Sequence, residues 1–373
     1  MKSYKTNRRN FIKTTVAGTA IGTLGLWNSQ AAQAAETGKR QLKIAGYGYD
    51  RVRPIMDRKV GIENTEIIFD IESIYNVNSY AFGPEQKYEV TEIGLIPFIR
   101  KYVNEGFRSY TLIPVFISRT FRHRNIFVHV DSGIEKPEDL RGKRVGTPSY
   151  AFSANTWIRG FLLDQYGVKA DEMQWIETTD SSDGVKLSPK LNRHFLPDDF
   201  PIVKGPPGID ESELILSGGC DALITAITPK AFMDDNPKIK QLFPDVRAVE
   251  QDYYRKTRLF PIMHAVAIRA DVVKANPELP KQVFQMYSKA KQQAYANLTD
   301  LTALFVTLPW AAQDIDNTRK LMGKNFWPYG IDENRGELEV VMRYCYEQGL
   351  IKHQMKFEEL FHPSTMELKE DTV

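Results

Sequence analysis

Short apolar segments separated by stretches of helical periodicity recur along this chain of 373 residues, and this alternation constrains its fold more than any other feature. Residues 41–47 and 66–71 alternate polar and apolar side chains as β-strands do. Two further strands, 88–93 and 110–113, follow, with a predicted helix at 97–104 between them. Because strands that alternate with helices favour parallel sheets covered on both faces, we predict an α/β fold with mainly parallel sheets flanked by helices.

The chain is predicted to leave its first domain and to return to it. After a strand at 126–130, a second domain begins near residue 146 and opens with a helix at 153–166. The apolar, β-rich run 259–269 brings the chain back. Two crossings between two lobes make a hinge. The predicted lobes are residues 35–145 with 266–373 for lobe 1, and residues 146–265 for lobe 2.

Composition and charge favour a small-molecule partner over nucleic acid or a membrane surface. With 42% apolar and 26% charged residues, the chain is typical of globular proteins. The formal net charge is +2, but five Lys and Arg residues and no acid precede Glu36, so the rest of the chain carries −3. No Lys/Arg-rich tract remains there that would bind nucleic acid or anionic lipid.

The first 34 residues have the organisation of an export signal. Paired arginines, Arg8-Arg9, precede a weakly apolar stretch at 14–27 and then the small-residue site Ala32-Gln33-Ala34. This order resembles a twin-arginine signal peptide, and the apolar stretch is too short to span a membrane. We therefore predict that the twin-arginine translocase exports the protein, that residues 1–34 are removed, and that the mature protein works in the periplasm without stable membrane insertion.

No pattern in the sequence indicates a metal or an organic cofactor. There is no Walker loop, no G-x-G-x-x-G after a predicted strand and no H-E-x-x-H, and the six histidines lack ligand spacing. Cys220 and Cys345 are too few to predict a disulfide framework or a Cys-based zinc site, although one bridge between them stays open. We expect neither metal nor cofactor.

Four stretches of the chain together resemble a known family. They are Pro114–His123, Leu140–Gly146, Thr257–His264 and Trp327–Gly330. These segments are similar to the 4,5-dihydroxyphthalate decarboxylase family, which lies within the periplasmic-binding-protein type 2 fold beside the solute-binding subunits of ABC importers. The resemblance implies two lobes that close on a ligand. The second stretch occurs in many binding proteins and so supports the fold rather than an activity.

Ligands of open α/β sheets bind beyond the carboxyl ends of strands, next to helix N-termini. Asp50 and Arg51 directly follow the first predicted strand, and Ser149 lies just before the helix at 153–166. Ser149 or Ser153 could cap that helix and leave backbone amides directed at an anion. We expect Asp50, Arg51 and Ser149 to bind ligand.

Arginine is suited to clamp a carboxylate, because its planar guanidinium donates two parallel hydrogen bonds. Arg51 and Arg119 are candidates for such a clamp, and Arg258 lies before the return crossing, where it would be a cleft or a hinge residue. Salt bridges within the protein are the alternative. Successive side chains alternate in direction along the run 119–124, so its three arginines cannot all face one cleft.

Three titratable residues are candidates for proton transfer. His123 and His264 lie in stretches that carry the resemblance, and Glu92 lies at the end of a predicted strand. If the protein decarboxylates an aromatic acid, one of them would protonate the ring carbon. The alternatives are a hydrogen-bonded core histidine and a glutamate paired with a neighbouring arginine.

Aromatic residues could hold an aromatic ligand by stacking. Tyr150 and Tyr329 lie at turns rich in Gly and Pro, and Trp157 lies on the helix at 153–166, where it would equally serve as core. We include all three among the candidate ligand-binding residues.

Two functions remain open from the sequence. The first, which we favour, is an extracytoplasmic solute-binding protein that closes on a small anionic aromatic carboxylate and delivers it to an ABC permease. The second is a cofactor-independent aromatic acid decarboxylase, in which arginines hold the carboxylates while a histidine or carboxyl group protonates the ring. The export signal favours the first function and the family resemblance favours the second.

Overall fold

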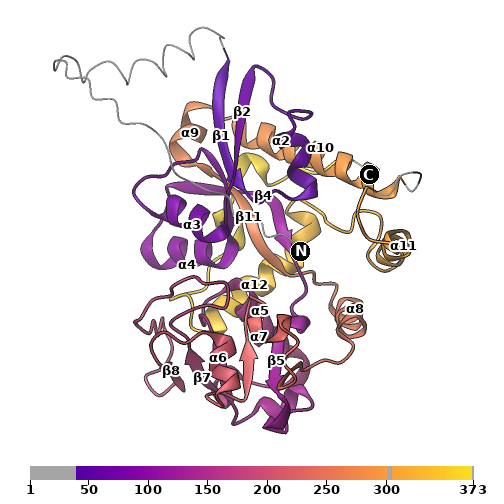
Figure 1. The fold of residues 1–373 in the computed structure, drawn as a ribbon. Coiled ribbons are helices and arrows are strands. Elements are labelled where there is room, and N and C mark those ends of the chain that lie inside the picture. Colours follow the sequence, from indigo (N-terminus) through magenta and orange to yellow (C-terminus); the bar gives the residue numbers. More distant parts are fainter. Residues whose placement is uncertain (1–38, 301, 303–304, 372–373) are drawn as a thin grey trace, which may run out of the picture.

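The computed structural model describes residues 39–300, 302 and 305–371, and it shows two lobes, each built on one β-sheet (Figure 1). The predicted export signal, residues 1–34, lies outside the described residues. Within the part of the chain that is described, no helix is both long and apolar enough to cross a membrane. The predicted α/β class is confirmed.

The first sheet has the strand order β2-β1-β3-β11-β4. Its central strand β3 is buried at every position, as expected for a strand covered on both faces. β1 pairs in parallel with β2 and β3, whereas β11 is antiparallel to both of its neighbours, so the sheet is mixed. The strands are β1 (Arg40–Gly46), β2 (Thr65–Ile71), β3 (Val90–Gly94), β4 (Tyr110–Arg119) and β11 (Ile262–Arg269).

The second sheet has the strand order β10-β5-β9-β6-β7-β8. The four strands from β9 to β8 are parallel to one another, while β5 is antiparallel to both β9 and β10. The strands are β5 (Ile126–His129), β6 (Arg144–Thr147), β7 (Gln174–Glu177), β8 (Ile202–Lys204), β9 (Ala222–Ile224) and β10 (Ile239–Gln241).

Helices lie against both sheets (Figure 1). The long helix α5 ends at Gly167, whose φ of 64° is the left-handed conformation that glycine adopts without strain. The helices are α2 (Arg53–Met56), α3 (Ile74–Phe82), α4 (Leu95–Glu105), α5 (Ser153–Tyr166), α6 (Glu211–Leu216), α7 (Lys230–Met233), α8 (Val246–Thr257), α9 (Ala270–Ala275), α10 (Leu279–Thr299), α11 (Ala311–Met322) and α12 (Arg335–Glu347).

The chain passes between the two sheets twice. It leaves the first sheet after β4 and enters the second at β5, so residues 120–125 form the first linker. It returns at β11, as the run 259–269 predicted. The change of sheet after β4 comes earlier than the boundary at 146 that we expected, because β5 pairs with β9 and β10. The sequence of a single apolar strand does not show which sheet the strand will join. The limits of the lobes otherwise stay a prediction.

One hydrophobic core joins the lobes where α12 packs on α5, between the two sheets (Figure 1). A Cβ atom added at Gly160 of α5 would lie 2.1 Å from the ring of Tyr344 on α12, so only glycine permits this approach. Trp157 Nε1 donates to the Ile262 carbonyl at 3.0 Å and adds a polar tie between α5 and β11. Cys220 and Cys345 are both buried and free.

Replacing Gly160 by alanine should destabilise the protein. The new methyl group overlaps three ring carbons of Tyr344, and overpacking of this kind costs about 1–3 kcal/mol. The matched control is Gly336→Ala on α12, where the nearest atom would lie 3.6 Å from the new Cβ. Urea denaturation should show a lower free energy of unfolding for Gly160→Ala and an unchanged or slightly higher one for Gly336→Ala. Equal stability of the two variants would contradict this packing.

Candidate functional site

A cavity of about 290 Å³ lies between the two lobes. Four of its lining residues, Tyr47, Pro97, Ser153 and Ala226, come from segments that follow the carboxyl ends of β1, β3, β6 and β9, where ligands of open α/β sheets bind. They are Tyr47, Ile74, Tyr75, Asn78, Gly94, Pro97, Arg122, Phe152, Ser153, Ala154, Asp183, Ala226, Ile227, Met263 and His264. Both lobes and the first linker therefore contribute to one site.

His264 lines this cavity and is paired with the buried carboxylate of Glu92 behind it. Glu92 on β3 and His264 on the adjacent β11 approach so that His264 Nδ1 lies 2.6 Å from Glu92 Oε1. Glu92 is 2% exposed, and it also accepts hydrogen bonds from the Tyr49 hydroxyl and the Tyr47 amide, both at 2.9 Å. Since Nδ1 is engaged, Nε2 is the ring nitrogen of His264 left for a ligand. This arrangement fixes the imidazole so that it can hold and release a proton.

The guanidinium of Arg122 enters the cavity from the first linker. Its contacts with protein are long: Nε donates to the Met263 sulfur at 3.4 Å, and Nη1 donates to the Ala226 carbonyl at 3.3 Å and to Asn125 Oδ1 at 3.5 Å. No carboxylate of the described residues forms an ion pair with it. Burial, and then the charge of Arg124, lower the pKa of Arg122 to about 10, so it remains a cation at neutral pH. Arg122 is therefore available to an anionic ligand.

The N-terminus of α5 faces the same cavity. Ser153 and Ala154, in its first turn, line the cavity, and no side chain caps the helix at Phe152. First-turn N–H groups have no partner within a helix, and the helix dipole makes this end positive. The cap that we expected from Ser149 does not form, since Ser149 Oγ accepts instead from the Ala151 amide at 3.3 Å. The open amides add to the attraction of Arg122 for an anion.

Two tyrosines and one carboxylate complete the polar lining. The rings of Tyr75 on α3 and Phe152 meet edge to face across the lobes, 6.5 Å apart. Burial, and then the carboxylate of Asp183, raise the pKa of Tyr75. Burial also raises the pKa of Tyr47. Both hydroxyls therefore stay protonated at neutral pH and can take part in hydrogen bonds with a ligand.

The arginines that we expected to clamp a ligand are engaged with protein groups. Arg51 Nε and Nη2 donate to the Ile117 carbonyl at 2.8 and 2.5 Å, and its guanidinium lies between the rings of Tyr49 and Trp327. Arg119 is buried and pairs with Glu337 at 2.6 Å. Both arginines therefore make contacts within the protein, which was the alternative to a ligand clamp, because their N–H groups already have acceptors. Asp50 is exposed and contacts Arg51.

The predicted aromatic residues and Arg258 lie outside the interlobe cavity. Tyr150 is fully buried against Trp175 and Phe200, and Tyr329 is buried in the core of the first lobe. Trp157 is fully buried in the core that joins the lobes. Arg258 ends α8 in an exposed, left-handed conformation with φ of 60°.

His123 is a buried core residue. Its ring stacks on Phe161 with a centroid distance of 4.1 Å, and neither ring nitrogen has a hydrogen-bond partner. Burial lowers the pKa of His123 to about 4, so it is neutral at pH 7 and does not reach the cavity. The structure therefore brings together only two of the three predicted proton-transfer residues, Glu92 and His264.

Several cavity residues were not predicted from the sequence. Tyr47 directly follows the first strand, and Arg122 lies in the first linker. Both could have been predicted as site residues, because the strand pattern places them just beyond the ends of strands. Tyr75 and Asn78 lie on a helix with no distinguishing motif, and Asp183 lies in an irregular loop without periodicity. Nothing in the local sequence of these three residues indicates that they meet.

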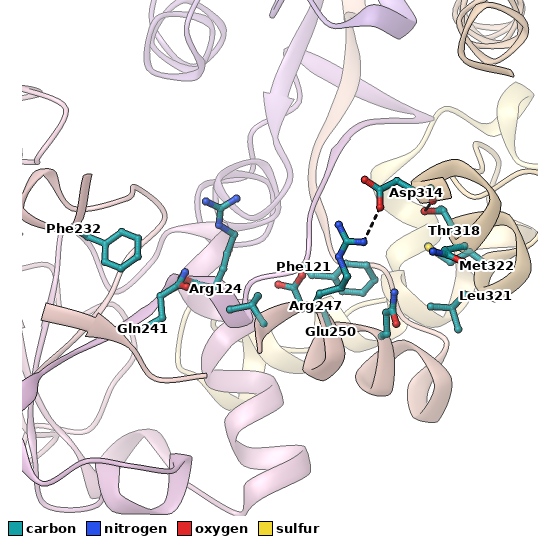
Figure 2. Close-up of a pocket in the computed structure, with 13 residues that line it drawn as sticks. Phe121, Arg124, Phe232, Gln241, Arg247, Glu250, Asp314, Thr318, Leu321 and Met322 are labelled. Carbon is teal, nitrogen blue, oxygen red and sulfur yellow. Dashed lines mark hydrogen bonds and ion pairs between the residues drawn. The ribbon is translucent and has the colours of Figure 1, made fainter. Parts of the chain in front are cut away.

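A larger cavity, of about 600 Å³, lies away from this site, between α8, α11 and the first linker (Figure 2). Arg247 and Asp314 form an ion pair across it at 2.7 Å, as the dashed line in Figure 2 shows. It contains no histidine, and the N-terminus of α8 that lines it is already capped by the carboxylate of Asp245, which accepts from the Ala248 amide at 3.0 Å. Among the described residues no cluster of three or more potential metal ligands occurs. We therefore assign the candidate site to the interlobe cavity.

Comparisons with known proteins find relatives along most of the chain. The chain is 35% identical over 331 residues to a 4,5-dihydroxyphthalate decarboxylase of Comamonas testosteroni, covering 88% of this chain and 98% of the relative. It is 34% identical over 219 residues to a protein of the same name from Pseudomonas putida, covering 58% of this chain and 82% of the relative. A family model described as NMT1/THI5 like matches residues 117–188.

A solved structure described as a putative sulfonate ABC transporter, periplasmic sulfonate-binding protein, from Methylobacillus flagellatus is also similar. The superposition has a TM-score of 0.49 and 14% sequence identity, and it covers 88% of this chain and 92% of that one.

Replacing His123 by phenylalanine should make the protein less sensitive to acid. The pKa of His123 is about 4 in the folded protein and 6.5 in an unfolded chain. As the pH falls through this window the unfolded chain takes up the proton first, so the free energy of unfolding falls. From pH 7 to pH 5 this one group should cost about 2 kcal/mol.

Urea denaturation at the two pH values measures this effect. His123→Phe should lose about 2 kcal/mol less than the unsubstituted protein on acidification. The control is His353→Gln, which removes an exposed histidine and should leave the pH dependence of stability as it was. The same acid sensitivity in His123→Phe and in the unsubstituted protein would show that His123 is not the buried neutral group described.

Proposed function

The chain belongs to the 4,5-dihydroxyphthalate decarboxylase family, as its resemblance predicted, and we propose that it removes carbon dioxide from a hydroxylated aromatic dicarboxylate bound between its lobes. One observation carries the proposal: His264, held by the buried carboxylate of Glu92, lines the same cavity as the unpaired guanidinium of Arg122. Such a cavity combines a proton donor with an anchor for an anion. A carboxy-lyase acting on a dicarboxylate needs both.

Substrate binding rests on the positive groups of the cavity. Arg122 and the open amides of α5 hold one carboxylate of the substrate, because both favour an anion and neither has a competing acid partner among the described residues. The ring then lies between the lobes near Tyr47 and Tyr75, whose protonated hydroxyls contact the ring substituents. This placement brings the second carboxylate to the side of the cavity formed by His264.

The chemical step needs a proton at the ring carbon that carries the second carboxylate. The Nε2 proton of His264 forms a C–H bond there, while a ring hydroxyl para to this carbon supplies the electrons. The bond from the ring to the carboxylate then breaks, its electron pair restores the aromatic ring, and carbon dioxide leaves. The negative charge of Glu92 stabilises the imidazolium before transfer, and solvent returns the proton afterwards. The hydroxyl takes the part that a cofactor plays in other decarboxylases.

The second candidate is the solute-binding function that we favoured from the sequence. It is supported by the enclosure of the cavity by both lobes and by the predicted twin-arginine signal in residues 1–34. In this case the protein works in the periplasm, closes on the same aromatic carboxylate without turnover and delivers it to an ABC permease. The family membership and the Glu92–His264 pair lead us to place the decarboxylase first, also as an exported protein.

Loss of the proton donor should slow turnover strongly while the substrate still binds. With 4,5-dihydroxyphthalate, His264→Gln should lower kcat by about 100-fold or more, since general acid catalysis contributes roughly 10²–10⁴. Glu92→Gln should also lower kcat, because the imidazole loses its orienting charge. Carbon dioxide release and thermal shift, recorded on the same samples, measure the two properties separately.

The exposed substitution His353→Gln serves as the control for both variants and should keep full activity. A thermal shift without carbon dioxide release in the unsubstituted protein would establish the solute-binding function instead. Release of carbon dioxide that is unchanged in His264→Gln would remove His264 from the mechanism.

A further inference from the structure

A second buried cation lies on α5, outside the interlobe cavity. Arg159 is 2% exposed, and its Nε donates to Gln348 Oε1 at 2.9 Å, while Nη2 has only a long contact with Thr156 Oγ1 at 3.4 Å. Nη1 has no hydrogen-bond partner. A guanidinium presents five N–H donors, so most of this group is unused. The face of the guanidinium lies 3.6 Å from the centre of the Tyr150 ring.

No described residue neutralises this charge. Glu177 accepts from the Tyr150 amide at 2.7 Å and lies 3.7 Å from Lys204, and it makes no ion pair with Arg159. Burial raises the pKa of Tyr150 and raises the pKa of Cys345 to about 12, so neither becomes an anion at neutral pH. An unpaired buried charge costs several kcal/mol, which indicates that a partner from outside the chain stabilises it.

A neighbouring arginine makes this region more positive. Arg100 Nη2 lies 2.9 Å from His194 Nδ1, and Arg100 has no ion-pair partner in the described part of the chain. Burial, and then the charges of Arg100 and Arg159, lower the pKa of His194 to about 3, so the imidazole is neutral and accepts from Arg100. Neither guanidinium forms an ion pair with a described acid, although the carboxylate of Glu177 lies near enough to attract both.

The space beside Arg159 has room for a ligand. Arg159 and Tyr150 line a cavity of about 380 Å³ between α5, α12 and the segment 195–200, and the Tyr150 hydroxyl also lacks a hydrogen-bond partner. The mouth of the cavity is apolar, because Leu163, Phe195 and Tyr346 line it with 37%, 50% and 44% of their surface exposed. The cavity shares no lining residue with the interlobe site.

We propose that this cavity is a second binding site, for a small organic monocarboxylate. The carboxylate accepts hydrogen bonds from Arg159 Nη1 and the Tyr150 hydroxyl, and the apolar body of the acid lies against Leu163 and Phe195. Lys169, Asp171 and Glu347 also line the cavity. The two carboxylates balance the charges of Arg159 and Lys169, so the lining has no surplus positive charge to hold an anion that carries more than one negative charge. The site does not depend on the function proposed for the interlobe cavity.

Titration calorimetry with benzoate tests the site on the full chain. The variant Arg122→Gln lacks the anchor of the interlobe cavity. Benzoate should still bind to this variant, in the cavity beside Arg159, with one site per chain. Adding Arg159→Gln should weaken this binding about tenfold or more, since hydrogen bonds to a charged group contribute that much. If Arg122→Gln alone removes all benzoate binding, the second site does not exist.

A second variant leaves Arg159 in place and blocks access. Leu163→Trp fills the exposed mouth of the cavity and should abolish benzoate binding, whereas Met233→Trp, at an exposed apolar position on α7, should have no effect. Benzoate binding that survives both Arg159→Gln and Leu163→Trp would overturn the proposal. Inorganic phosphate that binds this site more tightly than benzoate would overturn the assignment of a monocarboxylate.

Discussion

The side chain of Arg122 lies where the two lobes meet, and no carboxylate of the described residues neutralises it. This position follows from the topology, since the chain must pass from the first sheet to the second between β4 and β5, and Arg122 lies in that linker. Besides Asn125 in the same linker, it contacts the Met263 sulfur on β11 and the Ala226 carbonyl in the segment that follows β9. A cation held by both lobes attracts an anion to the space between them, and binding of that anion favours the closed arrangement.

The fold supplies the other parts of the site from fixed elements. Neighbouring strands β3 and β11 place Glu92 against His264, and Gly46 on β1 leaves room for the carboxylate, since a Cβ there would lie 2.9 Å from Glu92 Oε2. Helix α5 directs its uncapped N-terminus at the same space. Its middle is fixed by close packing on α12, so the direction of its first turn is determined by the core that joins the lobes. The candidate site therefore rests on paired strands and on one helix that is anchored by close packing.

The sequence predicted the architecture better than the site. The strands were readable as short alternating or apolar runs, and so were the two crossings. Glu92 followed from its place at the end of a strand, and His264 from a stretch that carries the family resemblance. The sequence did not show in which direction a long side chain points or which residues it contacts. The sequence does not distinguish Arg51 and Arg119 from Arg122. In the structure, however, Arg51 donates to the Ile117 carbonyl, and Arg119 pairs with Glu337, which lies more than 200 positions away in the sequence. Such tertiary partners decide which arginine stays available.

The most direct test of this account is a crystal structure of the Glu92→Gln variant with bound 4,5-dihydroxyphthalate. The substitution keeps His264 in place and slows turnover, because it removes the orienting charge. We expect one carboxylate against the Arg122 guanidinium and the first-turn amides of α5, and the ring carbon of the other carboxylate next to His264 Nε2. A ligand bound at Arg51 or Arg119, or one that leaves Arg122 without an anion, would contradict the account.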